Sequence, residues 1–96
     1  MEIVRVIARA EARDGKAEDL KLLLRSLVMP TRAEQGCRYY EFFESNLTGV
    51  FYFNELWNSL DDLKAHASTP RFLDVMAKAK ELLRAPMEVN LLSEVE

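Results

Sequence analysis

The sequence contains few of the residues that bind metals or form covalent cross-links. Among its 96 residues there is one cysteine, Cys37, and one histidine, His66. A lone cysteine excludes a disulfide within the chain and is typical of a reducing cytoplasm. A structural zinc site uses four Cys or His ligands, so none is expected. We therefore expect a cytoplasmic protein without a structural metal.

Long hydrophobic runs and excess positive charge are also missing. No run approaches the roughly 18–20 apolar residues that a membrane helix needs. Glu2 places an acid where a signal peptide carries positive charge, so we expect no signal peptide. The formal net charge is −3, and no basic stripe appears. We expect neither a membrane nor a nucleic acid among the partners.

The remaining composition is that of one globular domain. Apolar residues make up 49% and charged residues 30% of the chain, as in ordinary soluble proteins. A chain of this length can build one hydrophobic core but not two. We therefore expect residues 1–96 to form a single domain.

Four segments alternate between two sets of side chains, which predicts β-strands. They are residues 2–12, 37–44, 50–57 and 87–95. In the first segment Ala8, Ala10 and Ala12 share one face, which predicts a helix packed closely against that face.

Apolar residues at 3-4 spacing predict helices between these strands. The first helix begins after Gly15. Pro30 predicts that it ends or kinks near Met29 and resumes over residues 31–34, where Gly36 closes it.

Two further helices are predicted after the third strand. Ser59 caps a short helix. The inward stripe of that helix consists of Leu60, Leu63, His66 and Ala67. Thr69 then caps a helix over residues 70–83, with Pro70 at its first position.

The order of these elements is βαββαβ, which predicts a ferredoxin-like α+β fold. Right-handed crossovers place the helices on one face of an antiparallel sheet. Aromatic residues nevertheless occupy both faces of strands 37–44 and 50–57. A face that apolar is rarely left in water, so we expect two sheets to pack together in a homodimer.

The stretch from Val50 to Phe72 points Glu55, Trp57 and His66 towards one pocket. His66 is the candidate base because its pKa lies near working pH. Glu55 or Asp62 can orient its ring. A core histidine hydrogen-bonded to Glu55, without chemistry, remains an alternative, as does a purely structural Trp57.

The candidate site residues therefore fall into two groups. The candidate catalytic residues are His66 and Glu55. The candidate substrate-binding residues are Trp57, Tyr40, Asn54, Phe53 and Phe72.

Three motifs resemble the antibiotic biosynthesis monooxygenase (ABM) domain, a family that includes bacterial quinol monooxygenases. They are EQGCRYYEFF (34–43), FNELW (53–57) and LKAHASTPRF (63–72). The resemblance implies a dimeric α+β barrel with a small-molecule pocket between sheet and helices. It also implies oxidation of a quinol or hydroxylated aromatic by dioxygen, with no metal, flavin or other cofactor. The substrate would then supply the electrons after a base removes its phenolic proton.

Related branches imply other functions. Heme-degrading members use an Asn on the first strand and a Trp and a ligating His on the helices. The corresponding positions fall near Ala8, His66 and Val75, so the ligand and its partners are missing. An isomerase of a phosphorylated autoinducer-type dione remains an alternative, with Arg71 or Arg5 for the phosphate. The third alternative is a non-catalytic dimeric module that only binds a small molecule.

Overall fold

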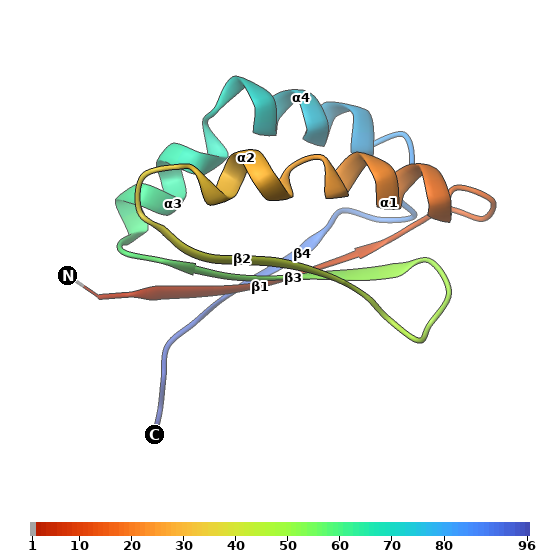
Figure 1. The fold of residues 1–96 in the computed structure, drawn as a ribbon. Helices are drawn as coiled ribbons and strands as arrows, with labels where there is room; N and C mark the ends of the chain where they lie inside the picture. The colour runs from red at the N-terminus through yellow and green to blue at the C-terminus, as the bar shows by residue number, and fades with distance from the viewer. Residues whose placement is uncertain (1) are drawn as a thin grey trace.

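The computed structural model describes residues 2–96, and these form one antiparallel sheet covered by helices on one face (Figure 1). The strands are β1 (Val4–Glu11), β2 (Cys37–Glu44), β3 (Val50–Trp57) and β4 (Glu88–Leu92). Their order in the sheet is β2-β3-β1-β4, so the first strand pairs with the last. The predicted ferredoxin-like α+β fold is confirmed.

Each of the two helical connections is divided into two helices, and all of them lie over the same face of the sheet (Figure 1). The helices are α1 (Ala17–Arg25), α2 (Val28–Arg32), α3 (Leu60–Ala67) and α4 (Pro70–Ala79). The last helix and the last strand are both shorter than predicted.

The break between α1 and α2 lies at Ser26 and Leu27, not beside Pro30 at Met29 as predicted. A proline lacks the N–H that would bond to the carbonyl four residues earlier, and its ring clashes with that carbonyl. For Pro30 that residue is Ser26, so the helix is interrupted one turn before the proline. Pro30 itself is tolerated in the first turn of α2, where N–H groups have no intrahelical partner.

Side-chain caps begin the two helices that follow β3, as predicted. The Ser59 hydroxyl accepts a hydrogen bond from the Asp62 N–H at 3.1 Å. The Thr69 hydroxyl accepts one from the Phe72 N–H at 3.2 Å. These caps fix where α3 and α4 begin and therefore which side chains they turn towards the sheet.

The core lies between the helices and the inner face of the sheet. The small residues of β1 belong to this core, on the face of the sheet that the helices cover (Figure 1). The close approach of a helix that the alanine pattern predicts stays a prediction. The main buried residues here are Val6, Ala8, Ala10, Leu20, Leu24 and Leu27.

Gly36 brings the segment before β2 against α3. Its φ of +84° lies in the left-handed region that favours glycine. A Cβ atom built on it would lie 2.2 Å from Cγ of Asp62, so the approach also needs the absence of a side chain. The Gly36 carbonyl accepts a hydrogen bond from the Asn58 N–H at 2.8 Å. This contact places Glu34, two residues earlier, beside α3.

The outer face of the sheet carries exposed apolar side chains. One continuous row of side chains across the four strands consists of Tyr39, Leu56, Arg5 and Leu92. Tyr39 is 38% and Leu92 46% exposed, and Phe43, four residues after Tyr39 on the same face of β2, is 48% exposed. No helix of residues 2–96 covers this face (Figure 1). The predicted homodimer, which would cover it, remains a prediction.

Candidate active site

An apolar cavity of about 390 Å³ lies between the sheet and the helices. Val6 and Ala8 from β1 form its floor, and Val89 and Leu91 from β4 line one side. All four residues of the predicted inward stripe of α3 line the cavity: Leu60, Leu63, His66 and Ala67. This volume is within the range of small-molecule binding sites.

The side chains of His66 and Glu34 form a hydrogen-bonded pair at the wall of this cavity. His66 is 3% exposed, and its Nδ1 lies 2.9 Å from Oε1 of Glu34. Burial lowers the pKa of His66, and the neighbouring Glu34 carboxylate opposes this effect. When Nδ1–H donates to Glu34, Nε2 is the ring nitrogen that carries a free lone pair. The pair therefore presents a base to an apolar site.

The predicted partners of His66, Glu55 and Asp62, are both engaged elsewhere. Oε1 of Glu55 accepts a hydrogen bond from the Trp57 indole N–H at 2.9 Å. Oδ2 of Asp62 accepts one from the Ser59 hydroxyl at 3.0 Å. The prediction that either carboxylate orients His66 is wrong, because Glu34 occupies that position.

Glu55 lines the cavity as a second titratable group. It is 6% exposed, and burial raises its pKa to about 7, with the Trp57 hydrogen bond acting in the opposite direction. The negative charge of Glu34 raises it further. Burial therefore favours the protonated carboxyl of Glu55, which can donate as well as accept a hydrogen bond.

Three aromatic rings surround His66. The ring centroids of Trp57 and Phe72 both lie 4.8 Å from that of His66, and Tyr40 lies at 5.6 Å. Tyr40, Phe72 and Phe53 line the cavity, as predicted for substrate-binding residues. Trp57 is fully buried behind His66 and does not line the cavity, so it holds His66 and Glu55 in place.

Asn54 was predicted to bind substrate, but the structure places it on the outer face of the sheet. Its Oδ1 accepts a hydrogen bond from Nη1 of Arg5. Side chains alternate along a strand, so Asn54 cannot share a face with its neighbours Phe53 and Glu55. Arg5 lies on the same outer face and is therefore unable to hold a phosphate in the cavity.

Within residues 2–96, no group of three or more Cys, His, Asp or Glu side chains is arranged to hold a metal ion. None of the helices in this part of the chain combines the length and apolar character needed to span a membrane.

The fold and the cavity together define a ferredoxin-like α+β protein with an apolar cavity under its helices. The model of the family "Antibiotic biosynthesis monooxygenase" matches residues 3–78. The chain belongs to this family.

Individual relatives agree with this assignment. The chain is 37% identical to Rv0793 of Mycobacterium tuberculosis, over 97% of this chain and 92% of that protein. It is 35% identical to YcnE of Bacillus subtilis, over 85% and 87% of the two chains. Both relatives are named, provisionally, as monooxygenases.

Solved structures of relatives show the same fold. The structure of Rv0793 superposes with a TM-score of 0.93 at 36% identity and covers 99% of this chain and 97% of that one. The structure of PA3566 from Pseudomonas aeruginosa gives a TM-score of 0.92 at 31% identity, covering 100% and 97%.

Proposed function

We propose that the protein is a cofactor-independent monooxygenase that oxidises a quinol or another small hydroxylated aromatic with dioxygen. The observation that carries this proposal is the Glu34–His66 pair, a base held in an apolar cavity of ligand size. A phenol is mostly un-ionised near neutral pH, so a base that removes its proton supplies the electron-rich phenolate that reacts with dioxygen.

The reaction balances without an external reductant. A hydroquinone and one dioxygen give a hydroxyquinone and one water, so the substrate supplies all four electrons that dioxygen accepts. His66 Nε2 takes the phenolic proton, and the phenolate passes one electron to dioxygen. The two radicals then combine through a new C–O bond. The oxygenated carbon loses its proton as the O–O bond cleaves, and it becomes a carbonyl carbon. The departing oxygen takes up two protons, which balance those released by the phenol and by the carbon, and leaves as water.

Glu55 is suited to the proton transfer at the end of this sequence. Its carboxyl group lines the cavity, and one oxygen is fixed by the Trp57 indole. The other oxygen is the one available to a ligand. In its protonated form this carboxyl can donate its proton to the departing oxygen while His66 holds the proton taken from the phenol.

The isomerase alternative receives less support from the charges around the cavity. Arg5 lies on the outer face, and Arg71 is exposed and does not line the cavity. Among the lysines and arginines of residues 2–96, Lys64 alone lines it. A phosphate group is usually held by several cations or backbone donors, so a neutral substrate fits this cavity better.

We also propose that the outer face of the sheet is the interface of a homodimer. Its exposed Tyr39, Phe43 and Leu92 are the kind of apolar patch that marks such an interface. The catalytic cavity lies on the opposite face, so each subunit of this dimer would contain a complete pair of His66 and Glu34.

The experiment that tests the proposed function is oxygen uptake with a panel of quinols, with the rate in air compared with the rate under nitrogen. We expect consumption of one dioxygen per quinol and formation of a hydroxyquinone. Turnover that continues without oxygen would favour the isomerase. Binding without turnover would favour the non-catalytic module.

A further inference from the structure

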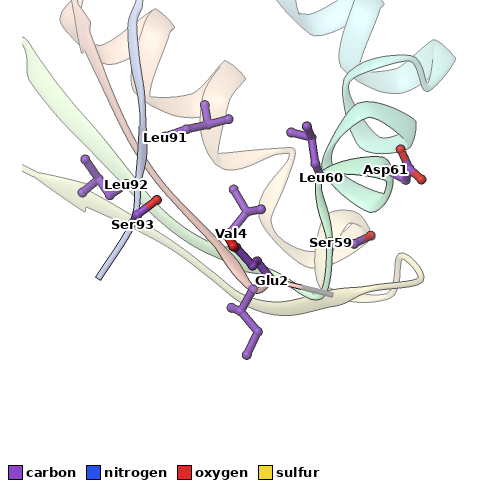
Figure 2. A pocket seen from close by; sticks show the side chains of 9 residues that line it. Glu2, Val4, Ser59, Leu60, Asp61, Leu91, Leu92 and Ser93 are labelled. Carbon is purple, nitrogen blue, oxygen red and sulfur yellow. The ribbon is translucent and has the colours of Figure 1, made fainter. Parts of the chain in front are cut away.

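A second hollow of about 380 Å³ lies beside the cavity, at the end of the sheet where β1 begins and β4 ends (Figure 2). It is bounded by Val4 of β1, by Ser59 and Asp61 at the start of α3, and by Leu92 and Ser93 at the end of β4. We call it the outer hollow. None of the candidate catalytic residues lines it.

The outer hollow and the cavity share two lining residues, Leu60 of α3 and Leu91 of β4. Figure 2 shows that these two side chains point towards one another from opposite walls. Val4 lines the outer hollow, and Val6, on the same face of β1, lines the cavity. The two spaces therefore follow one another along β1, with a constriction between Leu60 and Leu91.

The two leucines at the constriction are unusually accessible for side chains that line a ligand site. Leu60 is 42% and Leu91 52% exposed. Apolar surface of this kind gains free energy when a ligand covers it. An occupant that passes between them would contact both walls at once.

The charges at the outer hollow indicate what kind of occupant fits. Its charged lining residues are Glu2 and Asp61, both acidic. Within residues 2–96, no lysine or arginine lines it. An anionic end group would meet like charge there, so these charges disfavour an anion. The apolar surface of Leu60 and Leu91 favours an uncharged chain over a cationic one.

We propose that the substrate carries an uncharged apolar side chain that passes between Leu60 and Leu91 into the outer hollow, while its oxidisable ring lies beside His66. This inference rests on the proposed function, and it narrows the substrate class to quinols or phenols with an apolar tail. Leu60 and Leu91 then act as specificity-determining residues for the tail.

The test is a calorimetric comparison of two oxidised naphthoquinones, which bind without turnover. One carries only a methyl group, and the other carries an unbranched eight-carbon chain. Burial of each methylene group strengthens binding by up to roughly fourfold. We expect the tailed quinone to bind at least about tenfold more tightly to the native protein. The same chain ending in a carboxylate should bind more weakly than one ending in a hydroxyl group.

Leu60→Trp narrows the constriction, and Leu73→Trp is the matched control. Leu73 is an exposed leucine of α4 that lines neither space. We expect the preference for the tail to fall to within about twofold in Leu60→Trp and to persist in Leu73→Trp. Leu91→Trp serves the same purpose on β4 if Leu60→Trp does not fold, as judged by circular dichroism.

Two results would overturn the inference while leaving the proposed function intact. One is equal binding of the two quinones by the native protein. The other is a preference for the tail that survives the narrowing substitutions. If neither quinone binds and no quinol supports oxygen uptake, the proposed function itself is refuted, and the inference is refuted with it.

Discussion

Glu34 and His66 are 32 residues apart in the sequence, yet their side chains meet at 2.9 Å. The pair joins the segment that follows α2 to the last turn of α3. His66 is buried and Glu34 is partly accessible, so the carboxylate is the member of the pair that remains in contact with solvent. The hydrogen bond to Glu34 engages Nδ1 of His66 and fixes the orientation of its ring. Nε2 is then the ring nitrogen available to a ligand in the cavity.

Replacement of His66 by alanine should lower turnover with a quinol by about 10²–10⁴-fold, the usual contribution of a general base. The residual rate should rise with pH because the substrate then ionises without help. Oxygen uptake measures both effects, and circular dichroism checks the fold. Unchanged turnover in a correctly folded variant would remove His66 from the mechanism.

Replacement of Glu34 by glutamine should shift the acidic limb of the rate profile to lower pH. The Glu34 carboxylate raises the pKa of His66, so its loss lowers that pKa and also makes the base weaker. The measurement is kcat/KM as a function of pH. Asp74→Asn is the control, because Asp74 is an exposed acid that pairs with Lys78 away from the cavity. If the acidic limb of the Glu34→Gln profile lies at the same pH as that of the native protein, Glu34 does not act on His66 in this way.

Glu55 should make the protein less stable as pH rises from about 4.5 to about 7, the interval between the ordinary pKa of the carboxyl group and its raised value in the fold. In that interval the folded state retains the proton that the unfolded chain releases, so unfolding becomes easier. The shift corresponds to a stability difference on the order of 3 kcal/mol.

The Glu55→Gln variant keeps an acceptor for the Trp57 indole but cannot ionise. Urea unfolding at pH 5 and pH 8 should therefore show a smaller loss of stability in the variant than in the native protein. The other titrating groups are common to both proteins and largely cancel. An identical loss in both would show that Glu55 is charged in the folded state throughout.

Alanine substitutions at Gly36 and Gly15 should separate backbone strain from steric contact. Both glycines have positive φ, but a Cβ atom on Gly15 meets nothing within 4 Å, whereas one on Gly36 meets Asp62. Gly15→Ala should cost about 1–2 kcal/mol of unfolding free energy. Gly36→Ala should cost more and should also lower activity, because it displaces the segment that carries Glu34. Equal losses of stability in the two variants would mean that the Asp62 side chain moves away from the new Cβ atom at no cost in free energy.

Introduction of a charge at the outer face of the sheet should dissociate the proposed dimer. Phe43→Glu buries a carboxylate in that interface, whereas Leu73→Glu places one on the helical side and is the control. Sedimentation at low micromolar concentration should show a dimer for the native protein and for Leu73→Glu, and a monomer for Phe43→Glu. A native protein that is monomeric and folded would exclude this interface.

The periodic parts of the structure were predictable because they depend on neighbours in the sequence. The caps at Ser59 and Thr69 and the alanine face of β1 follow from local spacing alone. The break at Ser26 was also implicit, since a proline affects the carbonyl four residues earlier more than the residue beside it.

The pairing of Glu34 with His66 was not predictable in this way. No spacing links a residue in the segment after α2 to one in α3, and Glu55 and Asp62 were nearer to His66 in sequence and carry the same carboxylate group. The meeting of Glu34 and His66 depends on tertiary contacts, above all on the close approach of Gly36 to α3. The placement of Asn54, in contrast, followed from strand alternation, because Phe53 and Glu55 already occupied the inner face.

The pairing of β1 with β4 has a consequence for how the cavity forms and how it can open. The wall that contains Val89 and Leu91 belongs to the last strand, all of whose residues are exposed, and it is held to the sheet by β1 alone. During synthesis the residues that carry the base and its aromatic neighbours leave the ribosome before the residues of this wall. A short edge strand with little burial is also the kind of segment most prone to local opening. The side of the cavity formed by β4 is therefore the side expected to open most readily, on the timescale of local unfolding rather than that of side-chain rotation.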